Sequence, residues 1–191
     1  CTIIIKASEI APCSLLYFAR LIKEAGIPDG VVSVITGDEK NCAIPLTTHH
    51  DIDRIAFTGG PKVAKQIVIN SSENFAVTTL ELGGKSPIVV FEDADIEGAV
   101  NGIIAGNYGA SGQSCVAGTR VIVHDSIKKE LIEMLSKRAE SIVTGDPKNN
   151  DTHVGPLCTN KQIKLIEKTL KKAQSQGAKI VFGGSRLNQK G

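Results

Sequence analysis

Two short stretches of the sequence carry residues that could do covalent chemistry. Residues 80–87 read LELGGKSP and place one carboxylate, Glu81, at the end of an apolar run and beside two glycines. Residues 112–115 read GQSC and end on one thiol, Cys115, which small residues follow. A thiolate flanked by small residues can reach a substrate as a nucleophile, and a separate carboxylate can activate a water. The two lie far apart in the sequence, so only the fold can bring them to one site.

Both residues also have an ordinary structural interpretation. Cys115 could be a packed core thiol, and its local sequence alone favours that interpretation. Glu81 could cap the element that follows it or pair with Lys85. The immediate neighbours of each residue therefore leave two interpretations open.

The elements that must position these residues alternate between strands and helices. Apolar runs predict strands at residues 2–6, 31–35, 52–57, 77–82, 87–91, 120–124 and 179–182. Helical patterns cover residues 12–25, 61–68, 95–108, 125–142 and 159–177, and a weaker one that Pro45 interrupts covers 38–50. Asp125 is predicted to cap its helix, and Thr159 with Gln162 forms a capping-box pattern. Such alternation predicts an α/β fold of parallel β-α-β units.

Composition excludes several classes of function. The chain has 191 residues, is 41% hydrophobic and carries 22 basic against 20 acidic residues. The basic residues are scattered, so we expect no nucleic-acid partner. No apolar stretch approaches the ~20 residues that span a bilayer, so we expect no membrane span.

The cysteines and histidines indicate a reducing compartment and no metal. Five cysteines lie far apart with no paired spacing, which is typical of free thiols, and we expect a cytoplasmic protein. The histidines show no ligand spacing either. The four histidines are His49, His50, His124 and His153. We therefore expect no metal site.

Several stretches together resemble one family. The LELGGKSP and GQSC stretches closely resemble the active-site signatures of the NAD(P)-dependent aldehyde dehydrogenase superfamily. Further stretches agree with the family in the same order: residues 6–9 (KASE), 24–28 (EAGIP), 57–59 (FTG), 93–95 (DAD) and 155–156 (GP). The resemblance runs through nearly all of the chain, and such a set is far more specific than any one motif.

The resemblance implies an aldehyde dehydrogenase-like α/β fold of parallel three-layer β-α-β units. Family members begin before Thr2 and extend past Gly191, so the resemblance implies a fold incomplete at both ends. It also implies a division near residue 83. Residues 1–83 would be a partial dinucleotide-binding domain, and residues 84–191 a partial catalytic domain.

The resemblance also implies a reaction. Cys115 would attack an aldehyde and form a thiohemiacetal, which loses a hydride to the nicotinamide ring and becomes a thioester. Glu81 would activate the water that hydrolyses this thioester to a carboxylic acid. The family's oxyanion-stabilising asparagine has no counterpart in this sequence, although backbone N–H groups around Cys115 could serve the same purpose.

The implied cofactor is NAD rather than NADP. The family holds the pyrophosphate after the FTG stretch, at the start of a helix, where unpaired N–H groups attract anions. This chain has Gly60 where many relatives have serine, and it lacks a G-x-G-x-x-G fingerprint. The resemblance implies that five residues contact the cofactor: Lys6, Glu9, Gly59, Gly60 and Leu82. A carboxylate at Glu9 would accept hydrogen bonds from the ribose hydroxyls and repel a 2′-phosphate, which favours NAD. The structural alternative is that Lys6 and Glu9 form an ordinary exposed charge pair.

Two other functions stay open beside the dehydrogenase. The chain could be a catalytically inactive truncated remnant or interaction module that binds no cofactor. It could also be a weak esterase that uses Cys115 and Glu81 without hydride transfer. In each case we expect a homo-oligomer, because cut β-α-β layers leave sheet edges and apolar faces uncovered.

Overall fold

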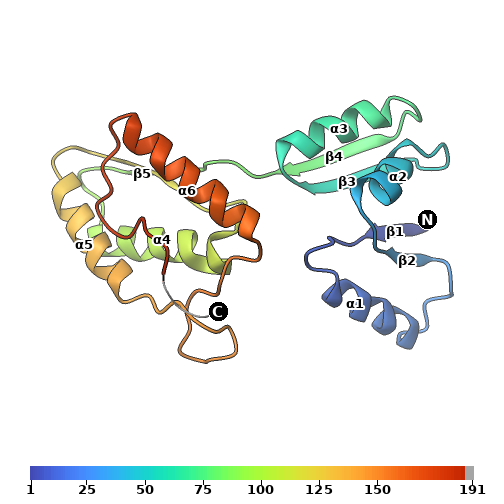
Figure 1. Cartoon of the computed structure of the whole chain (residues 1–191), viewed down its shortest axis with the longest axis horizontal. Helices are drawn as coiled ribbons and strands as arrows, with labels where there is room; N and C mark the ends of the chain where they lie inside the picture. Colours follow the sequence, from blue (N-terminus) through green and yellow to red (C-terminus); the bar gives the residue numbers. More distant parts are fainter. Residues whose placement is uncertain (188–191) are drawn as a thin grey trace. The chain divides into compact units, whose positions relative to one another are not determined.

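Contacts divide the chain into two compact units, Cys1–Leu82 and Gly83–Gly191. The structure is a computed structural model, and it describes residues 1–187 (Figure 1). Among these residues, every helix is too short or too polar to cross a bilayer. The two units are described in turn.

The first unit contains two parallel strand pairs. Its elements are β1 (Ile3–Lys6), α1 (Cys13–Glu24), β2 (Val32–Ile35), η1 (Glu39–Ala43), α2 (Ile44–Thr48), β3 (Arg54–Gly59), α3 (Pro61–Ser71) and β4 (Val77–Leu82). Strand β1 pairs with β2, and β3 pairs with β4, both in parallel. A helix connects the strands of each pair, α1 in the first and α3 in the second (Figure 1). These are the parallel β-α-β units that the sequence predicts.

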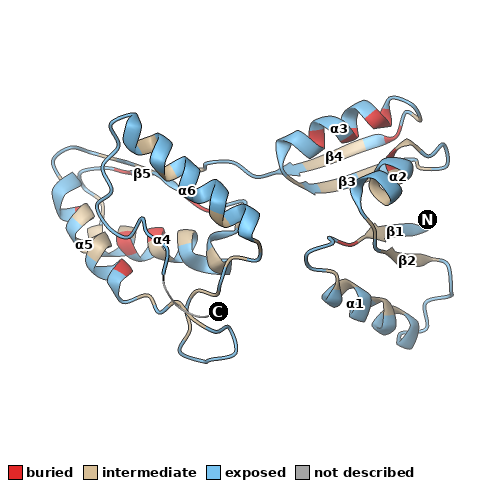
Figure 2. Ribbon diagram, in the orientation of Figure 1, coloured by how far each residue is buried: buried red, intermediate tan, exposed pale blue. Residues whose placement is uncertain are grey.

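The second unit repeats this arrangement once and adds two helices. Its elements are β5 (Pro87–Val90), α4 (Ile96–Tyr108), η2 (Gly109–Gly112), β6 (Arg120–Val123), α5 (Lys128–Glu140) and α6 (Asn160–Ser175). Strands β5 and β6 pair in parallel, and α4 lies between them in the sequence. Val100 and Ile103 of α4 pack with Leu131 of α5 to form the buried core. Figure 2 shows buried positions on α4 and α5, whereas α6 has none.

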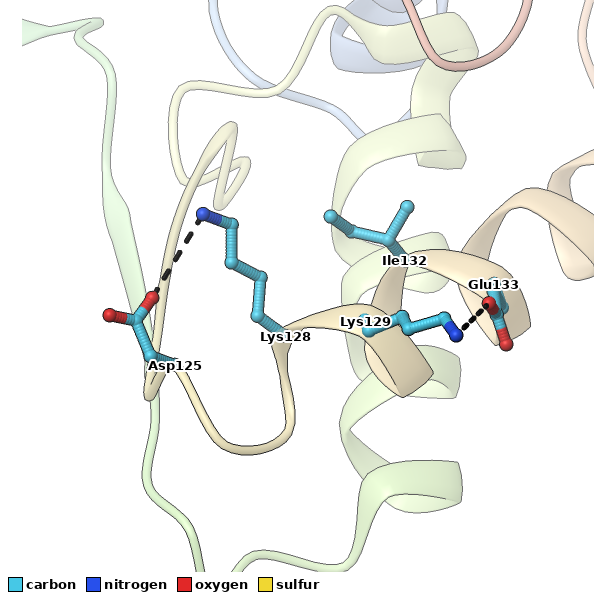
Figure 3. Close-up of a pocket in the computed structure, with 5 residues that line it drawn as sticks. All are labelled: Asp125, Lys128, Lys129, Ile132 and Glu133. Carbon is cyan, nitrogen blue, oxygen red and sulfur yellow. Dashed lines mark ion pairs between the residues drawn. The ribbon is translucent and has the colours of Figure 1, made fainter.

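Two predictions about helix starts have different outcomes. Thr159 caps α6 as predicted, because its Oγ1 accepts the N–H of Gln162 at 3.2 Å. The prediction for Asp125 is wrong, because α5 begins at Lys128 and its cap position, Ile127, makes no side-chain cap. The chain turns first, and the backbone carbonyl of Asp125 accepts the N–H of Lys128. The carboxylate of Asp125 instead lies 3.9 Å from the Lys128 ammonium (Figure 3).

Two further predictions concern residues 38–50 and residues 179–182. Residues 38–50 do contain helices, η1 and α2, and Pro45 lies in the first turn of α2 rather than breaking it. The predicted strand at 179–182 is wrong, because these residues pair with no strand among residues 1–187. Val181 and Phe182 instead line a hollow with Leu135 and Ala139 of α5, and Val181 stays 64% exposed.

Candidate active site

Cys115 lies on the segment that connects η2 to β6 in the second unit. Its side chain is exposed, and the next residue, Val116, is 79% exposed. Within this unit Cys115 is therefore not a packed core thiol, which was the structural alternative. An exposed thiol on a connecting segment is open to a substrate or to an alkylating reagent.

The far end of this segment is fixed by packing and hydrogen bonds. Ala117 and Gly118 are buried directly after the exposed residues. A Cβ at Gly118 would collide with the side chain of Ile88, so a larger residue would force Ile88 to move. Asn107 of α4 donates its side-chain N–H groups to the carbonyls of Ile103, at 2.9 Å, and Gly118, at 3.0 Å. The chain that leaves Cys115 is thereby tied to α4.

Backbone N–H groups around Cys115 are free to bind an anion. Within residues 1–187, the N–H groups of Cys115 and Val116 donate no hydrogen bond. The N–H of Ser114 likewise donates no bond within residues 1–187, whereas Gln113 donates to Ala110 and Ala117 donates to Ser114. Free amides beside a nucleophile can stabilise the oxyanion that forms when the thiolate attacks a carbonyl.

The near end of the segment contains a feature that sequence reasoning missed. Ala110 and Ser111 both have left-handed backbone conformations, with φ of 50° and 54°. A left-handed conformation costs a non-glycine residue about 1–2 kcal/mol. The sequence signals only the turn at Gly112, because neither alanine nor serine is a residue that favours this conformation.

Glu81 lies in the first unit, one residue before the end of β4, and its side chain is exposed. Within that unit its carboxylate makes no ion pair or side-chain hydrogen bond among the residues described. Cys115 belongs to the second unit, so neither unit by itself contains both residues. An unpaired carboxylate at the carboxyl end of a parallel strand has the chemistry of a general base.

The structure brings three of the candidate cofactor residues together. Gly59 ends β3, Leu82 ends β4, and the two are paired in the strand register. Gly60 follows as the N-cap of α3, which begins at Pro61. The carboxyl edge of parallel strands beside a helix N-terminus is where α/β folds hold phosphate groups. A Cβ at Gly60 would meet nothing within 4 Å, so the backbone there is open to a ligand.

Lys6 and Glu9 form an ion pair directly after β1. The Lys6 Nζ lies 3.1 Å from the Glu9 Oε2. A backbone N–H first, and then the Lys6 side chain, hold the pKa of the Glu9 carboxyl below its usual value. The predicted charge pair is therefore present. A carboxylate held in its ionised form can also accept hydrogen bonds from ribose hydroxyls.

We expect Lys6→Met to raise the pKa of Glu9 towards its usual value, because the change removes the ammonium that favours the carboxylate. Because the pKa of the Glu9 carboxyl is lower in the folded protein than in the unfolded chain, its ionised form stabilises the fold, fully so at pH values above the pKa that Glu9 has in the unfolded chain. This stabilisation is lost as the pH falls through the pKa that Glu9 has in the folded protein. Carbon NMR titration of the Glu9 carboxyl measures the shift. Lys23→Met, which breaks an exposed pair with Asp29 at 3.6 Å, is the matched control. An unchanged Glu9 titration in Lys6→Met would contradict the assigned cause.

Three adjacent residues could in principle hold a metal, although the sequence shows no separated ligand spacing. The ligand atoms of His49, His50 and Asp51 lie within 4.8 Å of one another, and all three residues are exposed. His49 Nδ1 accepts the backbone N–H of Asp51 at 3.2 Å. His50 Nε2 lies 3.3 Å from the Asp51 carboxylate. These contacts account for the cluster, and we assign no metal to it.

A hollow of about 370 Å³ lies elsewhere in the second unit, at the start of α5. Asp125, Lys128, Lys129, Ile132 and Glu133 line it (Figure 3). Two ion pairs at 3.9 Å, one of them between Lys129 and Glu133, use its charged groups. It includes none of the predicted site residues.

Comparisons with known proteins agree on one family. The sequence profile of the Aldehyde dehydrogenase family matches residues 1–191. A (Z)-2-((N-methylformamido)methylene)-5-hydroxybutyrolactone dehydrogenase of Acinetobacter baylyi is 52% identical over 184 residues, which are 96% of this chain and 38% of that protein. The chloroplastic betaine aldehyde dehydrogenase of Beta vulgaris is 39% identical and covers 97% of this chain and 37% of its own length.

Solved structures show the same likeness. PnpE in complex with nicotinamide adenine dinucleotide matches with a TM-score of 0.96 and 40% identity, over 99% of this chain and 39% of its own. Betaine aldehyde dehydrogenase from Staphylococcus aureus in complex with NAD⁺ matches with a TM-score of 0.96 and 35% identity, over 99% of this chain and 38% of its own. The chain thus spans a little over a third of the length of the relatives it matches. Its fold, its ordered motifs and a match along its whole length place it in the aldehyde dehydrogenase family.

Proposed function

We propose that this chain supplies the nucleophile, the general base and part of the cofactor site of an NAD-dependent aldehyde dehydrogenase. The observation that carries the proposal is the exposed thiol of Cys115 together with the free backbone amides of Cys115 and Val116, on a segment that is anchored at Gly118. Cys1, Cys13 and Cys158 are exposed as well, so what distinguishes Cys115 is a reachable thiol on the segment that also carries the free amides.

The reaction begins with attack of the Cys115 thiolate on the aldehyde carbon, which forms a C–S bond and an oxyanion. The free N–H groups at Cys115 and Val116 stabilise that oxyanion. A bound NAD would supply the acceptor for the hydride that leaves the same carbon. Cys115 then carries a thioester. Glu81 takes a proton from a water, the water oxygen attacks the thioester carbon, and the C–S bond breaks to release a carboxylic acid and restore the thiolate.

The residues at the ends of β3 and β4 fit a dinucleotide. We propose that the edge formed by Gly59, Gly60 and Leu82 receives the pyrophosphate side, because an open glycine and a helix N-terminus suit an anion. Lys6 and Glu9 would hold the ribose, and the Glu9 carboxylate favours NAD over NADP. On this assignment, residues 1–83 are the partial dinucleotide-binding domain and residues 84–191 the partial catalytic domain.

The cellular compartment is also a proposal. All five cysteines lie within the described residues, and none forms a disulfide. Dispersed free thiols suit a reducing compartment, which supports a cytoplasmic location.

We also propose that the protein assembles with copies of itself. Helix α1 has no buried residue, and Leu16, Phe18 and Leu21 on it are each more than 40% exposed. Exposed apolar faces of this kind mark association surfaces. We expect a dimer or larger assembly in sedimentation at micromolar concentration. A single monomeric species under those conditions would contradict this proposal.

The dehydrogenase proposal is tested by incubating the folded full-length gene product with NAD⁺ and aldehydes while NADH absorbance is followed. The aldehydes should include a short aliphatic aldehyde, betaine aldehyde and 4-oxobutanoate, whose ring-closed form is a 5-hydroxybutyrolactone. A rise in absorbance supports the proposal. Ester hydrolysis that depends on Cys115, without any NADH, would favour the weak esterase. Neither activity from folded protein would favour the inactive remnant or interaction module.

A further inference from the structure

The backbone directly before the Cys115 segment adopts a rare conformation. Ala110, Ser111 and Gly112 are all left-handed, with φ of 50°, 54° and 73°. Residues other than glycine visit this region as single residues, so two of them in succession are unusual. Strained backbone of this kind persists only where the surrounding structure holds it, and it clusters at functional sites. Some contact must therefore hold these residues.

The side chain of Ser111 provides such a contact. Its hydroxyl oxygen accepts the backbone N–H of Gly155 at 3.2 Å, across a long separation in the sequence. The chain at Gly155 is itself held, because its neighbour Val154 forms a parallel bridge with Thr144 and accepts the N–H of Gly145 at 3.1 Å. Ser111 therefore ties the strained turn to a fixed backbone position.

The Ser111 contact and the Asn107 contact lie on opposite sides of Cys115. Ser111 holds the chain before the segment, and Asn107 holds Gly118 after it. Most residues between them are exposed, among them Cys115, so packing holds this stretch less than it holds Ala117 and Gly118 at its far end. The direction in which the thiol and its free amides point thus depends on the two ends.

We propose that Ser111 is a positioning residue for Cys115. Its bond to Gly155 holds the left-handed turn and so fixes the thiol and the neighbouring N–H groups in one arrangement. This inference rests on the proposed function for the role of Cys115, although the ordering of the segment can be measured without any reaction.

Three substitutions separate the hydrogen bond from the backbone strain. Ser111→Ala removes the acceptor and keeps the strained conformation. Ser111→Gly removes the acceptor and relieves the strain. Ser111→Asn keeps an acceptor in its side-chain carbonyl, and asparagine tolerates the left-handed region. Ser175→Ala, an exposed serine on α6, is the matched control for loss of a hydroxyl.

The experiment measures hydrogen exchange by mass spectrometry on the full-length gene product, together with kcat and KM. In Ser111→Ala and Ser111→Gly we expect the backbone amides of residues 113–119 to exchange at least about fivefold faster. The reason is that losing the hydrogen bond to Gly155 makes local opening of this segment easier. We expect kcat to fall about tenfold with little change in KM, because binding is kept while the nucleophile is misplaced. Ser111→Asn and Ser175→Ala should match the unaltered protein.

Two results would overturn the inference. In the first, Gly155 exchanges faster in Ser111→Ala but residues 113–119 exchange at the original rate. That result would show that the bond between Ser111 and Gly155 does not order the segment around Cys115. In the second, Ser111→Gly behaves like the unaltered protein, which would show that strain alone matters. If Ser111→Ala does not fold, Ser111→Gly gives the same test. An unaltered protein without dehydrogenase activity would contradict the proposed function, and the exchange rates would still decide the role of Ser111.

Discussion

Cys115→Ala is expected to abolish aldehyde-dependent NADH formation, with a loss of about 10⁴-fold or more, as is typical when a covalent nucleophile is removed. The effect is large because alanine cannot form the C–S bond on which every later step depends. The free amides around position 115 would still be present, but they stabilise a charge that no longer forms. The rate of NADH appearance under saturating NAD⁺ and aldehyde measures the loss.

The matched control for this prediction is Cys158→Ala. Cys158 is also an exposed free thiol of the second unit, but it lies outside the segment that contains the free amides. We expect this variant to keep its rate, and mass spectrometry of the unaltered protein after reaction should find the acyl group on Cys115. A Cys115→Ala protein that still forms NADH at the original rate would assign the chemistry to another residue.

The regular part of the fold could be predicted because its signals are local. The apolar runs of β1 and β3 each indicate a strand from the sequence alone. Pro61 begins α3, and Thr159 caps α6, as the local sequence indicates. These features depend on a few neighbouring residues, so a single sequence is enough to place them.

The predictions that are wrong, and the contact that was missed, concern features that depend on residues distant in the sequence. The run at 179–182 has strand-like residues, but a strand needs a neighbour to pair with, and these residues have none among residues 1–187. Asp125 is a suitable cap by type, yet its own carbonyl takes the N–H that its side chain would have bound. The bond from Gly155 to Ser111 joins two loops and leaves no trace in the local sequence.

The same distinction between local signals and distant partners applies to the candidate site. Cys115 and Glu81 can be singled out only because their stretches, with five others in the same order, resemble one family, since the immediate neighbours of each residue leave a structural interpretation open. The sequence suggests backbone N–H groups near Cys115 as oxyanion donors, but it cannot show which of them are free or what holds the segment. The amides at Cys115 and Val116 are free only because of how the chain turns, and Asn107 contacts Gly118 only because α4 packs beside the segment.

Glu81→Gln is expected to separate the two halves of the reaction. Formation of the thioester needs Cys115 and NAD⁺ but no activated water, so the first turnover should still release NADH in a rapid burst. Hydrolysis of the thioester should then slow by about 10²–10⁴-fold, because glutamine cannot take the proton from the attacking water. Rapid mixing, followed by steady-state measurement, records the burst and the later rate in one experiment.

The outcome of Glu81→Gln distinguishes a base from a structural residue. Glu24→Gln, at the end of α1 in the same unit, removes the same charge from an exposed position and should leave both phases unchanged. Hydroxylamine should restore turnover of Glu81→Gln, since this strong nucleophile attacks the thioester without a base. If the substitution removes the burst itself, Glu81 acts before the thioester forms. If it slows neither phase, another group activates the water, and the carboxylate at the end of β4 has no part in the chemistry.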